Sequence, residues 1–189
     1  MQARFPYALR FSLRVPLVRS EADPGEAAID HYLVELLHLL SDGEEELVAR
    51  CIVYRIRRCE VEDVLLVADA DGYTALLEQV CAEGLEPDGT PIPEICRALE
   101  EVCCDPIVLD SLDFIEPLHD APVVRGLIAR AILETLGRGM EVLFLPGGRR
   151  EFPVWERALG AVRVGSFTVA SAALEPPEFP PAVVMGECN

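Results

Sequence analysis

PIVLDSLDFIEP, residues 106–117, opens the stretch of sequence that decides the fold. Three further segments follow it: APVVRGLIARAILETLGRG at 121–139, MEVLFLP at 140–146 and FPVWERALGAVRVGSFTVAS at 152–171. The first and third are apolar runs typical of strands, whereas the second repeats its apolar residues at helical spacing between Pro122 and Gly137. The fourth predicts a helix that ends at Gly160 and then a strand over residues 162–170. The predicted order is therefore strand, helix, strand, helix, strand.

The N-terminal third is predicted to add strands. Residues 5–18 alternate apolar side chains with arginines, which is the pattern of a half-buried strand. Residues 26–40 are compatible with two structures. The Asp-Pro-Gly-Glu sequence before them could begin a helix, whereas the turn sequence at 41–44 would make them the first half of a hairpin. We favour the hairpin, with residues 32–40 paired to residues 47–57.

Two short helices are predicted in the middle of the chain. One covers residues 73–82, with Asp71 as its N-cap, and the other begins at Pro93 and runs through Val102. Residues 83–93 between them contain glycines and prolines and predict a loop.

The length of 189 residues and the apolar fraction of 51% are typical of a folded protein with a sizeable core. We expect one domain over residues 1–174 and an extended Pro-rich tail over residues 175–189. No apolar run reaches the roughly 18 residues that a membrane span requires, and the N-terminus lacks the pattern of a signal peptide. We therefore expect a cytoplasmic protein that does not associate with membranes.

The formal charge of −17 is concentrated in one block of the chain. Residues 59–120 carry 17 acidic residues and one arginine, whereas the segments on either side are close to neutral. Such a block repels a phosphate backbone, so we expect no binding of nucleic acid. It attracts cations, which makes a small amine or a basic patch on another protein the expected partner. The alternative is a solvated face that only keeps the chain soluble.

The seven cysteines and three histidines do not form the closely spaced pairs of a zinc site. Cys103 and Cys104 are adjacent, and the histidines do not cluster near the cysteines. We expect reduced, buried thiols and no metal ion. A redox role for the adjacent pair is the alternative.

The order of the segments over residues 106–174 resembles the C-terminal half of GNAT-type N-acetyltransferases. In that superfamily a strand precedes a phosphate-binding turn and helix, and a second strand precedes a helix that ends in Leu-Gly, as at Leu159 and Gly160. The resemblance implies a mixed α/β (α+β) fold in which helices flank a mostly antiparallel central sheet. It also implies acetyl-CoA as the acyl donor.

The resemblance places the cofactor site at the start of the predicted helix over residues 122–136. In the family, an Arg/Gln-x-x-Gly-x-Gly/Ala motif points backbone N–H groups at the pyrophosphate of coenzyme A. The implied cofactor-binding residues of this chain are Arg125, Gly126, Leu127, Ile128, Ala129 and Arg130. The chain departs from the motif, because Val123 replaces the Arg or Gln and Ile128 replaces a small residue. We expect Ile128 to crowd the phosphates, and Arg130 has an alternative partner in Glu134.

The candidate catalytic residues lie on or just after the strand over residues 106–116. Asp113, Glu116 and His119 could each take a proton from an ammonium substrate, and Asp110 is near them. The alternative is that they are solvated side chains at the end of a strand. The family's tyrosine, which protonates the leaving thiolate, is replaced by Trp155, whose indole N–H does not ionise usefully.

Two functions are open at this point. The first is an acyl-CoA-dependent N-acyltransferase that acts on a cationic amine. The second is a GNAT-fold binding or regulatory module that has lost acyl-CoA binding, which the altered positions Val123, Ile128 and Trp155 favour. A homodimer, with the Pro-rich tail docked on a second subunit, is compatible with both.

Overall fold

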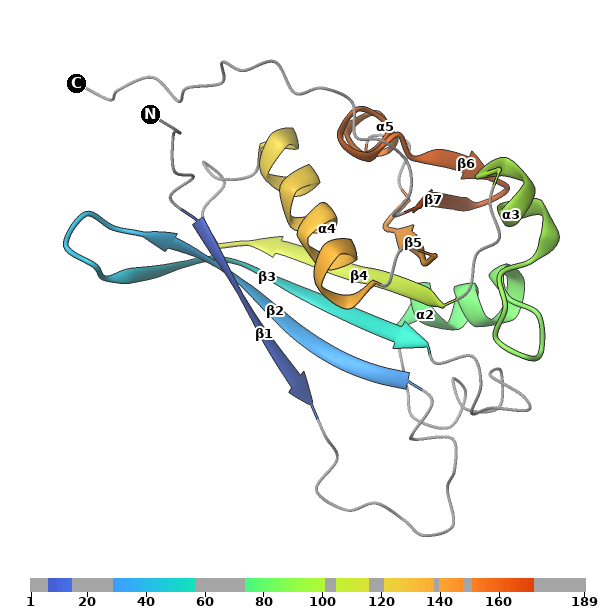
Figure 1. Cartoon of the computed structure of the whole chain (residues 1–189), viewed down its shortest axis with the longest axis horizontal. Helices are drawn as coiled ribbons and strands as arrows, with labels where there is room; N and C mark the ends of the chain where they lie inside the picture. Colours follow the sequence, from blue (N-terminus) through green and yellow to red (C-terminus); the bar gives the residue numbers. More distant parts are fainter. Residues whose placement is uncertain are drawn as a thin grey trace, which may run out of the picture.

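The computed structural model describes residues 7–14, 29–56, 74–100, 105–115, 121–137, 140–147 and 151–171. Within them, one mixed sheet of seven strands is flanked by helices (Figure 1). The strands are β1 (Tyr7–Arg14), β2 (Ile29–Leu39), β3 (Glu45–Ile56), β4 (Pro106–Phe114), β5 (Val142–Leu145), β6 (Val162–Val164) and β7 (Phe167–Ser171), in the order β1-β2-β3-β4-β5-β7-β6. The β4–β5 pair is parallel and the other neighbours are antiparallel. This confirms the expectation of a mixed, mostly antiparallel sheet flanked by helices.

The N-terminal strands form an antiparallel meander, and the alternative of a helix over residues 26–40 is wrong for the described part, residues 29–40. The turn between β2 and β3 is closed by two backbone hydrogen bonds between Leu40 and residues of the turn, at 2.9 and 3.1 Å. Gly43 has a φ of 88°, which a side chain would disfavour, and the Asp42 carboxylate accepts a hydrogen bond from the N–H of Glu44. The turn sequence therefore decides between the two structures.

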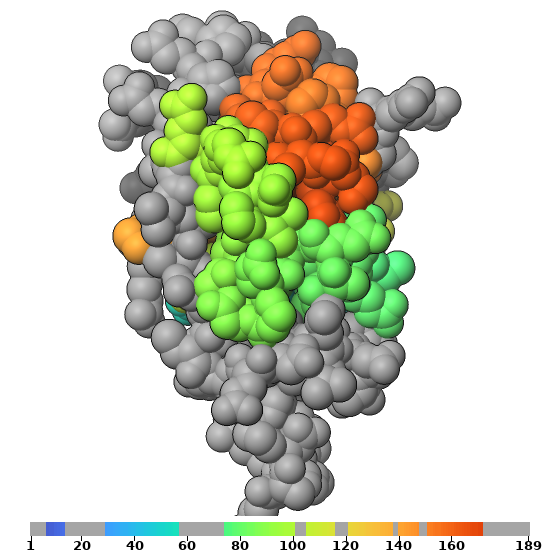
Figure 2. Space-filling model, turned by 90° about the vertical axis from the view of Figure 1, so that its right-hand side faces the viewer, coloured from blue at the N-terminus to red at the C-terminus, as the bar shows by residue number. Residues whose placement is uncertain are grey.

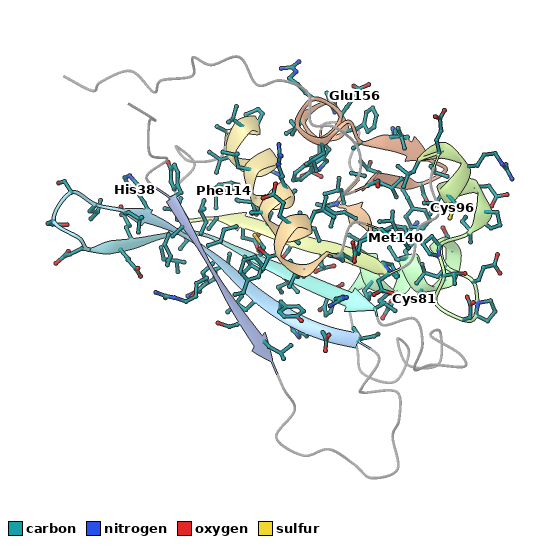
Figure 3. The ribbon with its side chains drawn as sticks, in the orientation of Figure 1. His38, Cys81, Cys96, Phe114, Met140 and Glu156 are labelled. Atoms are coloured by element: carbon teal, nitrogen blue, oxygen red, sulfur yellow. The ribbon has the colours of Figure 1, made fainter. Side chains whose placement is uncertain are left out.

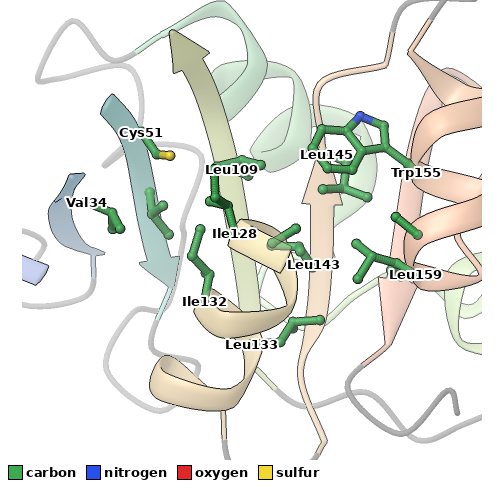
Figure 4. Packing of buried hydrophobic residues seen from close by; sticks show 14 of the residues in the cluster. Val34, Cys51, Leu109, Ile128, Ile132, Leu133, Leu143, Leu145, Trp155 and Leu159 are labelled. Carbon is green, nitrogen blue, oxygen red and sulfur yellow. The ribbon is translucent and has the colours of Figure 1, made fainter. Parts of the chain in front are cut away.

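Helices α4 (Pro122–Leu136) and α5 (Phe152–Leu159) cover one face of the sheet. The bounds of α4 match the predicted helix, because Pro122 begins it and Gly137 is its C-cap. Its buried residues include Val124, Ile128 and Ile132, which pack against β3, β4 and β5 (Figure 4). The same cluster extends across the sheet to Val34 of β2 and to Trp155 of α5.

The opposite face is covered by α2 (Ala75–Gln79), the π-helix η2 (Val80–Gly84) and α3 (Pro93–Ala98). Asp71 lies outside the described residues, and the side chain that caps α2 is Thr74, which accepts a hydrogen bond from the N–H of Leu77. The predicted helix over residues 73–82 thus begins two residues later and ends in a wider, π-helical turn.

The strand predicted over residues 162–170 is wrong as one continuous element. It is two strands, β6 and β7, which pair with each other through a tight turn at Gly165 and Ser166. Gly165 has a φ of 58°, which glycine adopts without strain. The Gly-Ser pair is the turn signal in the sequence that the apolar run around it obscures.

Several predicted features lie outside the described residues. They are the adjacent pair Cys103 and Cys104 and the tail at 175–189. The helix expected to run from Pro93 through Val102 is shorter than predicted, because α3 ends at Ala98 with Leu99 as its C-cap and Glu100 has a φ of 55°.

The π-helix generates a first prediction. A Cβ added at Gly84 would lie 3.0 Å from Cε1 of Phe144 and 3.4 Å from Cε2 of Phe167. These two rings pack edge to face with centroids 5.5 Å apart, so neither can move away freely. We expect Gly84→Ala to lower the free energy of unfolding by about 1–3 kcal/mol, despite the higher helix propensity of alanine.

Urea denaturation of both proteins measures this difference. Adding Phe144→Leu to the Gly84→Ala protein should cost less stability than the same change in the wild type, because it relieves the contact. A Gly84→Ala protein as stable as the wild type would show that the two rings yield to the added methyl.

Candidate functional site

The parallel strands β4 and β5 are paired over only three residue pairs. Pro106, Ile107 and Val108 lie opposite Val142, Leu143 and Phe144. Beyond that point β4 continues to Phe114, whereas β5 ends at Leu145 and is followed by Pro146, which has no N–H to continue the ladder. The ladder between the two strands therefore ends at the Val108–Phe144 pair, in the first half of β4.

A β-bulge in β4 lies directly after this point. Val53 of β3 is opposite Leu109 and Ile52 is opposite Ser111, so Asp110 is an extra residue without a partner on β3. Bulges break the regular ladder and redirect side chains, and they are frequent next to active sites. Asp110 is therefore a carboxylate at the bulge, two residues beyond the last β4–β5 pair.

Asp110 is held by the start of α2. Its Oδ1 accepts a hydrogen bond from the hydroxyl of Thr74, whose oxygen accepts in turn from the N–H of Leu77, at 3.5 Å. A hydroxyl has one proton, so the Thr74 proton is committed to Asp110 while its lone pair caps the helix. The bulge and the N-terminus of α2 are thus fixed to each other.

The other end of the α2–η2 segment is tied to the β6–β7 turn. The side-chain amide of Gln79 donates to the hydroxyl of Ser166 at 3.1 Å and to the carboxylate of Glu83 at 3.2 Å. The same hydroxyl donates to Glu83 at 3.4 Å. Figure 2 shows this part of the chain, in green, beside the red β6–β7 hairpin on one surface. The segment therefore spans from the β4 bulge to the far side of β5.

The surface that this segment shares with α3 is acidic. Six carboxylates between residues 74 and 100 are exposed, and they are Glu78, Glu83, Glu86, Asp88, Glu94 and Glu100. Arg97 is the one basic residue in this range. Part of the acidic block of the sequence therefore forms an exposed surface on the α2–η2 segment and α3.

On the opposite face, Arg125 connects three elements. Its guanidinium carbon lies 5.6 Å from the ring centroid of Phe114, the last residue of β4, and its Nη1 lies 3.6 Å from Oε1 of Glu151, at the start of α5. Arg125 itself belongs to the first turn and a half of α4. Its side chain therefore joins the end of β4, the start of α4 and the start of α5.

The remaining implied cofactor residues are divided between the core and the surface of α4. Gly126, Ile128 and Ala129 are buried, Leu127 is half-buried, and Arg130 pairs with Glu134 at 2.7 Å. Ile128 points toward the sheet among core side chains (Figure 4). The structure thus brings only part of this set to the surface, with Arg125 near the end of β4.

The first turn of α4 determines whether phosphates fit there. The N–H groups of the first turn of a helix have no partner within the helix, and Pro122 at the first position has no N–H. The donors that fit a diphosphate are therefore the N–H groups of Val123 and Val124 and the guanidinium of Arg125. Among the described residues, these three groups are the ones that could hold an anionic cofactor at this end of α4.

The predicted catalytic residues are only partly described. Asp113 is exposed on β4 opposite Arg50, and Glu116 and His119 lie outside the described residues. Asp110, which the sequence gives no reason to prefer over Asp113, is the residue at the bulge. The position of the bulge depends on how β4 pairs with β3, and no residue type in β4 indicates it.

Trp155 is part of the hydrophobic core. Its side chain is fully buried, and its Nε1 donates to the carbonyl oxygen of Pro146 at 3.2 Å. The indole therefore satisfies a backbone acceptor just beyond the end of β5. Ala161, directly after the end of α5, is also buried.

Two of the described cysteines, Cys51 and Cys81, are buried thiols with raised pKa values. Burial raises the pKa of Cys51 to about 12, with a further contribution from the charge of Asp113, and burial alone raises the pKa of Cys81 to about 12. Figure 3 shows Cys81 and Cys96 on the side of the sheet that carries α2 and α3. Among the described residues, no three His, Cys, Asp or Glu side chains lie close enough to share a metal ion.

No family model, no curated protein and no solved structure matches this chain. None of the described helices is long and apolar enough to span a membrane.

The hydrogen bond of Trp155 generates a second prediction. Trp155→Phe removes the donor and leaves the carbonyl of the half-buried Pro146 without it. We expect a loss of about 1–3 kcal/mol of unfolding free energy, measured by urea denaturation. A loss below about 0.5 kcal/mol would mean that the carbonyl finds another donor.

The buried thiols generate a third prediction. At pH 8, iodoacetamide should leave Cys51 and Cys81 unmodified in the folded protein and alkylate both in urea, as read by mass spectrometry. Because the pKa of each thiol is about 12 in the folded chain and 9.0 when the thiol is free in water, only the unfolded chain loses these protons between those values. Stability should therefore fall as the pH rises above 9. Alkylation of native Cys51 as fast as the half-buried Cys96 would contradict the assignment.

Proposed function

We propose that this chain has a GNAT-like fold and transfers an acyl group from acyl-coenzyme A to a cationic amine. The observation that carries the proposal is the end of the β4–β5 ladder directly before the bulge at Asp110, with α4 following β4. We infer that the two main chains separate beyond this point and leave an opening between them. An extended thioester can lie in such an opening.

The cofactor-binding groups follow from the first turn of α4. The N–H groups of Val123 and Val124 and the guanidinium of Arg125 would hold the phosphates. Bound acyl-coenzyme A would supply an activated thioester, to which an amine adds with release of the thiol. The irregular backbone around Asp110 would direct an N–H at the thioester oxygen, where negative charge develops.

The acidic surface supports a cationic acceptor. The exposed carboxylates of the α2–η2 segment and α3 would raise the local concentration of an ammonium compound or of a basic protein patch. Asp110 would then take the proton that the ammonium must lose before it attacks, and Thr74 keeps this carboxylate in one orientation. Asp113, further along β4, would add negative charge to the same site.

A second candidate is a binding or regulatory module of the same fold that does not use acyl-CoA. The environment of Trp155 favours it. The residue is fully buried and its N–H is bonded to Pro146, so it offers no acid for a leaving thiolate. In the enzyme, the thiolate would therefore take its proton from water.

Calorimetric titration with acetyl-CoA separates the two candidates and is the fourth prediction. We expect saturable binding with a dissociation constant in the range of about 1 µM to 1 mM that is usual for enzyme substrates. No heat of binding at millimolar acetyl-CoA would exclude the enzyme and leave the binding module.

A variant tests the role of Asp110. Asp110→Asn should bind acetyl-CoA like the wild type but slow the release of thiol with spermidine or kanamycin as acceptor by about 10²-fold or more. Asp113→Asn is the matched control on the same strand and should have the smaller effect. If the two changes had equal effects, Asp110 at the bulge would have no special role in the reaction.

A further inference from the structure

In the ion pair between Arg125 and Glu151, the carboxylate occupies Arg125 and so competes with the ligand that Arg125 is proposed to bind. Glu151 Oε1 lies 3.6 Å from Nη1 of Arg125, which is an ion-pair distance longer than that of a good hydrogen bond. The side chain of Arg125 is 18% exposed and that of Glu151 is 39% exposed. Both side chains are therefore partly exposed to solvent, and Nη1 of Arg125 faces a carboxylate.

The energy of this pair is small compared with that of a phosphate contact. Ion pairs with an exposed partner contribute about 0–1 kcal/mol, whereas hydrogen bonds between arginine and phosphate are short, charge-assisted and frequently bidentate. A phosphate would therefore displace Glu151 from Arg125, but at the cost of the existing pair.

Both partners of the pair stay stabilised after they separate. Glu151 is at the N-cap position of α5, where the partial positive charge of the helix end favours a carboxylate. Arg125 stays over the ring of Phe114, a contact that does not involve Glu151. Neither of these two contacts has to break when one anion replaces another at Arg125.

We propose that Glu151 is a built-in competitor for Arg125, which lowers the affinity for the phosphates of acyl-CoA until they displace it. This inference rests on the proposed function, and it adds a residue that neither the sequence nor the family resemblance indicates. The start of α5 thereby sets the affinity of a site whose donors all lie on α4.

The experiment is a calorimetric titration of the full chain with coenzyme A. Glu151→Gln removes the charge and keeps the shape, so we expect about threefold to fivefold tighter binding, the equivalent of up to about 1 kcal/mol. Glu156→Gln is the matched control, because Glu156 is an exposed glutamate on the same helix (Figure 3). It tests the general effect of one negative charge less and should change the affinity by less than about 1.5-fold.

Two further measurements locate the effect. Pantetheine, which carries no phosphate, should not distinguish Glu151→Gln from the wild type. In an Arg125→Gln background, which should weaken binding of coenzyme A by about tenfold or more, Glu151→Gln should give no gain. Circular dichroism of each variant confirms that it is folded.

The outcomes separate the two proposals. Coenzyme A that binds neither the wild type nor Glu151→Gln at millimolar concentration overturns the proposed function and this inference together. Coenzyme A that binds both proteins equally overturns only the role of Glu151. The same conclusion follows if Glu156→Gln gives an equal gain, or if the gain persists with pantetheine or without Arg125.

Discussion

Strand β4 constrains the rest of the structure, because it is the element on which both cores depend. Ile107 and Leu109 pack under α4 on one face, and Val108 packs under α2 and α3 on the other. The same strand joins the antiparallel meander on one side to the parallel strand β5 on the other. A strand in this position cannot shift its register without exposing one core or the other. The bulge at Asp110 is therefore fixed by packing on both faces.

The sequence predicts those elements whose signals are local. The helix α4 agrees with its predicted bounds because Pro122 and Gly137 mark its ends and its apolar residues repeat at helical spacing. The β2–β3 hairpin is likewise signalled by its turn. The π-helical turn, the β4 bulge and the division of residues 162–170 into two strands were not predicted. The first two depend on contacts made elsewhere, such as the approach of Gly84 to the ring of Phe144, whereas the turn at Gly165 and Ser166 has a local signal that the apolar run around it obscures.

The same distinction between local and non-local signals applies to the candidate site. The sequence places carboxylates near the end of β4 and an arginine near the start of α4, since both follow from the order of the elements. It does not indicate Thr74 as the partner of Asp110, because these residues are 36 positions apart and meet only through the fold. The contact of Arg125 with Glu151 is of the same kind, since α4 and α5 pack side by side on the sheet. Residues that act in pairs across elements are those that a single sequence reveals least.

The α2–η2 segment has a fixed length between its two attachments, Thr74 at Asp110 and Gln79 with Glu83 at Ser166. Removing one residue from a helix turns everything after it by about 100° around the axis. Glu83 would then point away from Ser166, even though no contact at Asp110 had changed. The wider π-helical turn thus sets the rotation of Glu83 about the helix axis relative to Thr74 at the other end of the segment. Insertions and deletions within residues 75–84 should accordingly be far less tolerated than substitutions on its exposed side.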